Sequence, residues 1–238
     1  MKCQVPGRDP LKKRSLGLFL LFGFFLLPLS ALSQTHSIED SMKNLAASPN
    51  FVEITHWQGV TVNLKYGTTD NFTRKNLYGP YNKCYVHKIT AEKLRKAIET
   101  LRKNNPGYKF IVFDALRPRS VQRKLWAVVK GTAHQKYVAD PDKGSMHNYG
   151  FALDIGLLDP KGKLVDMGAP FDGFTPLSEP QLESRLLKEG KLTQIQIDHR
   201  MILRSAMVGA GFRQLRHEWW HYDALTEEQV RGKFEIVE

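Results

Sequence analysis

Cysteine is almost absent from this chain, which has two cysteines among its 238 residues. Cys3 lies close to the N-terminus, so Cys84 alone remains for the body of the protein. This excludes a disulfide framework, and the fold must be held together by its hydrophobic core. No residue near Cys84 in the sequence supplies a base, so we expect a packed or idle thiol rather than a nucleophile.

The chain also lacks internal repeats and basic runs of the kind that bind RNA or DNA. It carries 35 Lys and Arg residues against 24 Asp and Glu residues, a formal charge of +11 at pH 7. Five of the basic residues and one acidic residue fall within residues 1–33, which leaves +7 for the remainder. We interpret this surplus as a solvated basic surface and expect no nucleic-acid partner.

One apolar run, residues 16–27, follows the basic N-terminus and precedes the small residues of Ala31-Leu32-Ser33. This arrangement is typical of a secretory signal peptide over residues 1–33, with cleavage before Gln34. The run is shorter than the roughly 20 residues that a membrane-spanning helix needs, so we expect no stable membrane insertion after cleavage. An uncleaved anchor is the alternative. The interpretation places the protein in the periplasm, or in the cytoplasm if the leader does not function.

Residues 34–50 are polar and without periodicity, and we expect a flexible leader there. The remaining residues, 51–238, are long enough for one domain with a sizeable core. Strand-like patterns fall at residues 51–64, 109–115, 151–158 and 212–222. Helical patterns fall at residues 90–104, 120–130, 198–209 and 226–233, with Thr90 and Asp198 as expected N-caps. The order follows no strict βαβ rhythm, which predicts an α+β fold, with helices packed on a small, mostly antiparallel sheet.

Two short segments carry the residue types from which metal sites are built. His147 and Asp154 stand seven residues apart around Gly150, and Glu218 and His221 stand three apart near the C-terminus. Zinc accepts imidazole and carboxylate ligands, and catalytic zinc keeps three protein ligands and one open position. The pattern therefore predicts one Zn²⁺ per chain, held by the two histidines and the aspartate. The glutamate is left beside the metal, where a hydrolase needs a base.

The geometry of the second segment is the harder part of this prediction. His147 precedes a strand on a loop bent by Gly150, so it and Asp154 can approach one ion from loop and strand. Glu218 and His221 would face opposite sides of a flat strand, because side chains alternate. The backbone there must twist, bulge or leave the sheet. The spacing also differs from the zinc-binding HExxH pattern.

The motifs Ser145-x-His147-x-x-Gly150-x-Ala152-x-Asp154 and Glu218-Trp-Trp-His221-Tyr222 resemble those of the D-alanyl-D-alanine dipeptidase family. Further blocks match in the same order, and the likeness covers residues 51–223. These blocks are Lys65-Tyr66 with Asp70-Asn71-Phe72-Thr73, Gly107-Tyr108 with Asp114-x-x-Arg117-Pro118, and Met167-Gly168-x-x-Phe171-Asp172. The secretory leader departs from the family, whose members are usually cytoplasmic.

The resemblance implies zinc-dependent hydrolysis of the dipeptide D-Ala-D-Ala, linked to cell-wall peptide metabolism. In such an enzyme zinc lowers the pKa of a bound water to about 7 and polarises the scissile carbonyl. The family pattern makes Glu218 the general base and acid, and Arg117 the stabiliser of the oxyanion. It pairs Asp172 with the ammonium group of the substrate, and it places Ser145 and Tyr66 in the same pocket.

Two other functions are compatible with the metal motifs. The first is a periplasmic D,D- or L,D-carboxypeptidase that trims peptidoglycan stem peptides. Asp172 argues against it, because an acid on the amino side obstructs a longer chain. The second is a non-catalytic peptidoglycan-binding module with a structural metal. Structural zinc sites are closed by four protein ligands, whereas three ligands with Glu218 and Arg117 to spare favour catalysis. The sequence makes no prediction of oligomeric state.

Overall fold

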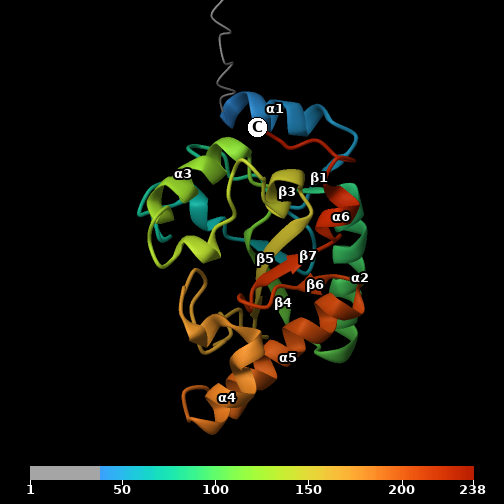
Figure 1. Cartoon of the computed structure of the whole chain (residues 1–238). Coiled ribbons are helices and arrows are strands. Elements are labelled where there is room, and N and C mark those ends of the chain that lie inside the picture. The colour runs from blue at the N-terminus through green and yellow to red at the C-terminus, as the bar shows by residue number, and fades with distance from the viewer. Residues whose placement is uncertain (1–37) are drawn as a thin grey trace, which may run out of the picture. The chain divides into compact units, whose positions relative to one another are not determined.

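The computed structural model describes residues 38–238 (Figure 1). The predicted signal peptide, residues 1–33, lies outside the described residues. Within the described part of the chain, none of the helices combines the length and the apolar character needed to cross a membrane.

A five-stranded mixed sheet carries the fold, and only its β2–β4 pair is parallel. In spatial order its strands are β2 (Val60–Val62), β4 (Lys109–Asp114), β5 (Ala152–Leu158), β7 (His221–Asp223) and β6 (Arg213–Gln214). A separate antiparallel pair joins β1 (Phe51–Glu53) to β3 (Tyr85–His87). The predicted α+β class with a small, mostly antiparallel sheet is confirmed.

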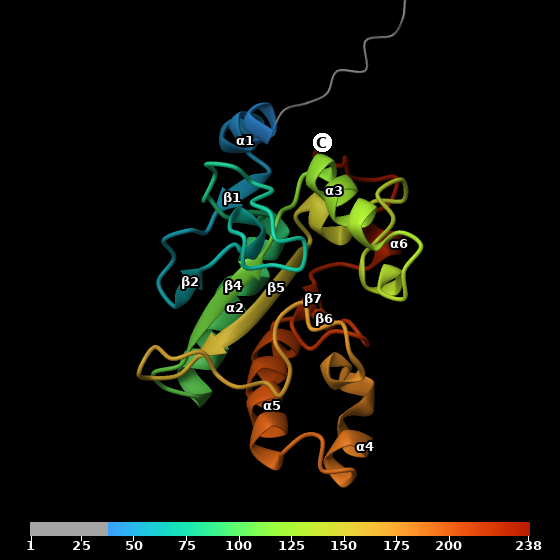
Figure 2. The same cartoon turned by 90° about the vertical axis from the view of Figure 1, so that its left-hand side faces the viewer.

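The two long helices, α2 (Lys88–Asn104) and α5 (Gln194–Gly209), pack against one another, and α2 also contacts β4. In Figure 2, α2 runs behind β4 and β5. Its buried residues recur every three or four positions, so one face of the helix belongs to the core. The shorter helices are α1 (Ile38–Ala47), α3 (Arg119–Val129), α4 (Glu183–Lys188) and α6 (Glu227–Val230).

Several expected elements have the right place but a different beginning. Helix α2 begins at Lys88 with His87 as its N-cap, while Thr90 lies inside it and donates a hydrogen bond to the carbonyl of Gly150. Helix α5 begins before Asp198. Thr193 is its N-cap and forms a capping box with Gln196. The expected cap at Asp198 was therefore wrong, because the capping box places the N-cap five residues earlier, at Thr193.

The expectation of a loose leader over residues 34–50 was wrong for its described part, because residues 38–47 form α1. Met42 and Leu45 of this helix are buried, a pair at i and i+3 that polar neighbours conceal in the sequence. Figures 1 and 2 show α1 beside the C-terminal end of the chain. There the hydroxyl of Ser41 donates to the backbone carbonyl of Glu238.

The register of the central strands decides where the site lies. Asp154 of β5 pairs with His221 of β7 on one side and with Asp114 of β4 on the other. The β4–β5 register shifts between Val112 and Asp114, an irregularity that ends the regular ladder next to these residues. Three chemically active side chains therefore begin from neighbouring strands at one level of the sheet.

Candidate active site

The three predicted metal ligands come from three different backbone settings. His147 lies on the 3-10 helix Met146–Tyr149, which Ser145 caps and which ends at Gly150 with a φ of +74°. A β-carbon at Gly150 would lie 2.7 Å from the backbone nitrogen of His87, so only glycine fits this bend. Asp154 and His221 extend from β5 and β7, and all three ligand residues are buried.

The distances between the facing ligand atoms fit one tetrahedral metal ion. His147 Nε2 lies 3.3 Å from His221 Nδ1 and 3.3 Å from Asp154 Oδ1, and the latter two atoms are 3.0 Å apart. Tetrahedral zinc with ligands at 2.0–2.2 Å separates its ligand atoms by roughly 3.3 Å. The site can therefore hold a metal without rearrangement of these side chains.

The second ring nitrogen of each histidine contacts an oxygen atom outside the ligand cluster. His147 Nδ1 is 2.6 Å from the carbonyl oxygen of Ala115, and His221 Nε2 is 3.0 Å from Asp223 Oδ1. Such contacts fix the ring orientation of metal-binding histidines. Burial lowers the pKa of His221, but Asp223 and Asp154 outweigh it and raise that pKa well above its ordinary value. The cluster thus provides an environment that favours a cation.

Glu218 lies on the loop before β7, not in the strand. Side chains alternate between the two faces only within a strand, and of the two residues only His221 lies in one. Glu218 and His221 can therefore face the same side although they are three residues apart. The carboxylate Oε2 of Glu218 is 3.9 Å from His221 Nδ1. Burial raises the pKa of Glu218 to about 8, with a further contribution from Asp154 and opposed by His221. A buried acid beside the ligand cluster is therefore poised to bind and release a proton.

The Arg117 side chain is immobilised next to the ligand Asp154. Its Nε and Nη2 are 2.7 and 2.6 Å from Asp114 Oδ2, and its Nη1 donates to Gln122 Oε1 at 2.7 Å. Its Nη2 is also 3.6 Å from Asp154 Oδ2. The Tyr66 ring lies under the guanidinium, 4.9 Å from Cζ to ring centroid. The arginine is thus a buried, fixed cation beside the cluster.

Asp172 and Tyr66 line the same cavity and contact one another. The Tyr66 hydroxyl lies 3.1 and 3.2 Å from the two carboxylate oxygens of Asp172. Burial raises the pKa of Asp172 well above its ordinary value, and the carboxylates of Asp154 and Glu218 raise it further. Asp172 also has a φ of +57°, a strained conformation for a residue other than glycine. Such strain is typical of residues that a binding site requires in one orientation.

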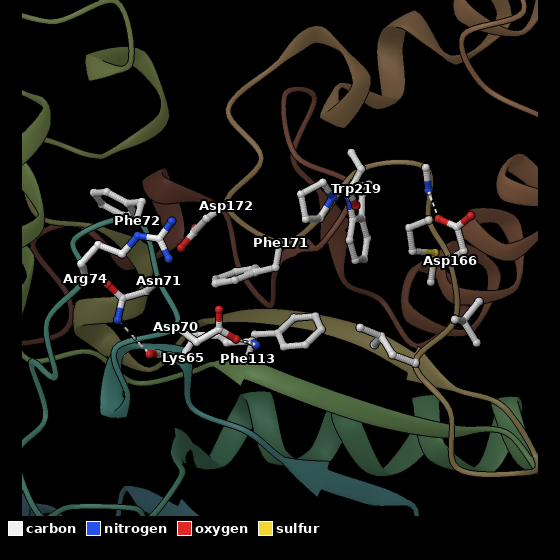
Figure 3. A pocket seen from close by; sticks show the side chains of 16 residues that line it. Lys65, Asp70, Asn71, Phe72, Arg74, Phe113, Asp166, Phe171, Asp172 and Trp219 are labelled. Atoms are coloured by element: carbon white, nitrogen blue, oxygen red, sulfur yellow. Dashed lines mark hydrogen bonds and ion pairs between the residues drawn. The ribbon is translucent and has the colours of Figure 1, made fainter.

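All eight predicted site residues line one cavity of about 530 Å³. They are His147, Asp154, His221, Glu218, Arg117, Asp172, Ser145 and Tyr66. Asp172 also lines a neighbouring cavity of about 730 Å³, where Figure 3 shows it with Phe171. The loop that carries these two residues therefore forms a partition between the two cavities. The structure brings the eight residues together, while their individual roles remain predictions.

Sequence reasoning assigned no role to the residues that hold the site in position. Asp114 accepts from Arg117 and, at 2.6 Å, from the hydroxyl of Tyr78. Gln122 and Asp223 support Arg117 and His221. Asp114 belongs to one of the blocks that match the family, and Asp223 stands two residues after His221, so a position in or beside the motifs was the available signal.

A buried His–Asp–His cluster beside an unligated acid and a fixed arginine, on an α+β fold, defines a hydrolase site of the metallopeptidase type. The profile of the D-ala-D-ala dipeptidase family of M15 peptidases matches residues 48–237. The chain belongs to this peptidase family, which confirms the resemblance seen in the motifs.

Curated relatives agree with this assignment. A D-alanyl-D-alanine dipeptidase of Escherichia coli K12 is 32% identical over 162 residues, which cover 68% of this chain and 77% of the relative. One of Enterococcus faecium is 31% identical over 202 residues, covering 77% of this chain and 94% of the relative. One of Enterococcus faecalis is 29% identical over 187 residues, which cover 71% of this chain and 88% of the relative.

Proposed function

We propose that this chain is a zinc-dependent dipeptidase that hydrolyses D-Ala-D-Ala and contributes to the metabolism of cell-wall peptides. The observation that carries the proposal is the ligand cluster itself, with separations of 3.0 to 3.3 Å, next to the buried and unligated Glu218. The relatives named D-alanyl-D-alanine dipeptidase support the choice of substrate.

Each residue has a chemical task in this reaction. Zinc held by the cluster would supply Lewis acidity toward the scissile carbonyl and an acidified water. Glu218 takes the proton from the attacking water and returns it to the leaving amine. Arg117 faces the position at which negative charge develops on the carbonyl oxygen. Asp172, supported by the Tyr66 hydroxyl, binds the substrate ammonium.

The position of Asp172 favours a dipeptidase over a carboxypeptidase. Its carboxylate stands in the cavity that holds the metal ligands, on the partition with the neighbouring cavity. A dipeptide brings an ammonium to this position, whereas a longer peptide brings an uncharged amide and further chain. An unpaired carboxylate would then be buried, which is unfavourable.

The test is an assay of alanine release by the purified, zinc-loaded protein. D-Ala-D-Ala, L-Ala-L-Ala and a pentapeptide that ends in D-Ala-D-Ala are compared at equal concentration. We expect the D-dipeptide to be preferred. Faster cleavage of the pentapeptide would reject the dipeptidase proposal in favour of a carboxypeptidase.

Export is proposed from residues 1–33 alone, and an N-terminus at Gln34 in the periplasmic fraction would support it.

Substrate binding should depend on the protonation of Asp172. Its raised pKa means that the carboxyl accepts a proton at a higher pH than the ordinary value of about 3.9. Since only the ionised form attracts an ammonium, the affinity for D-Ala-D-Ala should fall as the pH falls through this raised pKa. Calorimetric titration of the Glu218→Gln protein with the dipeptide isolates binding from turnover. Adding Asp172→Asn to that protein should weaken binding and flatten its pH dependence. A dissociation constant that stays level down to about pH 4 contradicts the assignment.

A further inference from the structure

The solvent-exposed rim of the metal cavity is built from three loops that are distant in sequence. Lys136 belongs to the 3-10 helix Gln135–Tyr137, Phe174 follows the partition loop, and His217 precedes Glu218. The side chains of Lys136 and His217 are 61% and 52% exposed, so they mark where the cavity opens to solvent. Whatever holds these three loops together therefore controls the width of the opening.

One buried carboxylate contacts two of the loops directly. Glu179 accepts hydrogen bonds from the hydroxyl of Tyr137 at 3.3 Å and from Nε2 of Gln181 at 2.9 Å. Its oxygens also lie 3.5 Å from Lys136 Nζ and 3.6 Å from His217 Nδ1. Only 8% of the Glu179 side chain is exposed, and the residue does not itself line the cavity.

The third loop is attached through an aromatic stack. The rings of Tyr137 and Phe174 are almost parallel, with an interplanar angle of 7° and centroids 5.0 Å apart. Phe174 follows Asp172 by two residues, and its backbone nitrogen donates to the carbonyl of Asp172. Both rings line the metal cavity. The stack therefore stands next to the position that the substrate ammonium occupies if Asp172 binds it.

We propose that Glu179 is a positioning residue that holds this rim closed on the amino side of the substrate and so limits the length of the peptide that the site accepts. The inference rests on the proposed dipeptidase function, because Asp172 identifies the amino side. The carboxylate of Asp172 supplies the negative charge that attracts a free ammonium group. The Tyr137–Phe174 stack, held by Glu179, supplies the wall that an added residue on the amino side would meet.

The experiment compares D-Ala-D-Ala with glycyl-D-Ala-D-Ala, which carries the smallest extension on the amino side. We expect Glu179→Ala to raise the ratio of kcat/KM for the tripeptide to that for the dipeptide by roughly tenfold or more. The kcat for the dipeptide should be retained, since Glu179 contacts no reacting group. Glu179→Gln should restore most of the selectivity, because its amide oxygen can still accept from Tyr137.

Glu183→Ala is the matched control. Glu183 is equally buried and only four residues away, but it pairs with Arg200 and Arg204 and does not contact the rim. Its loss should lower stability without changing the selectivity ratio. Tyr137→Ala removes half of the wall from a partly exposed position, and it should change the ratio in the same direction as Glu179→Ala.

The outcomes separate this inference from the proposed function. If the unmodified protein prefers the dipeptide but folded Glu179→Ala and Tyr137→Ala leave the ratio unchanged, the rim does not select length and the inference is wrong. If Glu179→Ala does not fold, the ratio measured for Tyr137→Ala decides alone. If the unmodified protein cleaves the tripeptide faster than the dipeptide, the dipeptidase proposal itself fails.

Discussion

Glu218→Gln should lower kcat for D-Ala-D-Ala by about 10²–10⁴-fold while the protein keeps its zinc. The expected loss is large because this carboxylate, which is not itself a predicted ligand, lies on the side of His221 that faces the other ligand atoms. Its Oε2 lies 3.9 Å from the ligand nitrogen of His221. Glutamine has nearly the same shape but cannot take a proton from water. Steady-state kinetics and the metal content after gel filtration measure the two quantities separately.

Asp154→Asn is the matched control, because it makes the same carboxylate-to-amide change within the cluster. Asp154 Oδ1 faces both His147 Nε2 and His221 Nδ1, so its loss should release the metal together with the activity. The two variants should therefore be equally inactive but differ in zinc content. Turnover of Glu218→Gln within tenfold of the unmodified protein would exclude Glu218 as the base.

The site residues that could be predicted from the sequence are those whose arrangement is set within one short segment of the chain. Around Gly150 the residues from Ser145 to Asp154 turn from a capped 3-10 helix into a strand, and each step depends on neighbours in sequence. Residue types alone could therefore identify His147 and Asp154 as a pair. The central strands β4 and β5 were predictable for the same reason, since buried strands are continuous apolar runs.

What the sequence could not predict depends on how distant segments pair. The register that sets Asp114, Asp154 and His221 side by side exists only once β4, β5 and β7 have assembled. Periodicity describes one segment at a time and contains no information on register between strands. The helix α1 was missed for a related reason. Its two buried apolar residues, Met42 and Leu45, find their partners in the folded chain, and a ten-residue polar helix is marginal without such contacts.

The pairing of distant strands also explains why the charges of the site depend on one another. Arg117 contacts Asp114 on β4 and lies 3.6 Å from the ligand Asp154 on β5, while Asp114 Oδ2 lies 3.6 Å from His147 Nδ1. A single guanidinium thus offsets two buried carboxylates, one of which is predicted to bind metal. The arginine is therefore expected to serve both the reaction and the folded state.

Arg117→Met should lower kcat for D-Ala-D-Ala by about 10²–10³-fold, because a fixed cation facing the developing oxyanion is lost. It should also destabilise the protein by roughly 3–5 kcal/mol, since Asp114 is fully buried and would lose its cationic partner. Arg117→Lys should recover part of the stability. Lysine cannot reproduce the fork that now reaches Asp114 and Gln122 together, so activity should recover less.

A double-mutant cycle with Asp114→Asn separates the two effects. In the Arg117→Met background, Asp114→Asn removes the uncompensated charge and can still accept from the Tyr78 hydroxyl. Chemical denaturation should therefore show that the second substitution restores stability to the first. Activity should stay low, because the cation near the oxyanion is still absent. If activity returned together with stability, Arg117 would act only as a partner for Asp114, and its place in the reaction would have to be withdrawn.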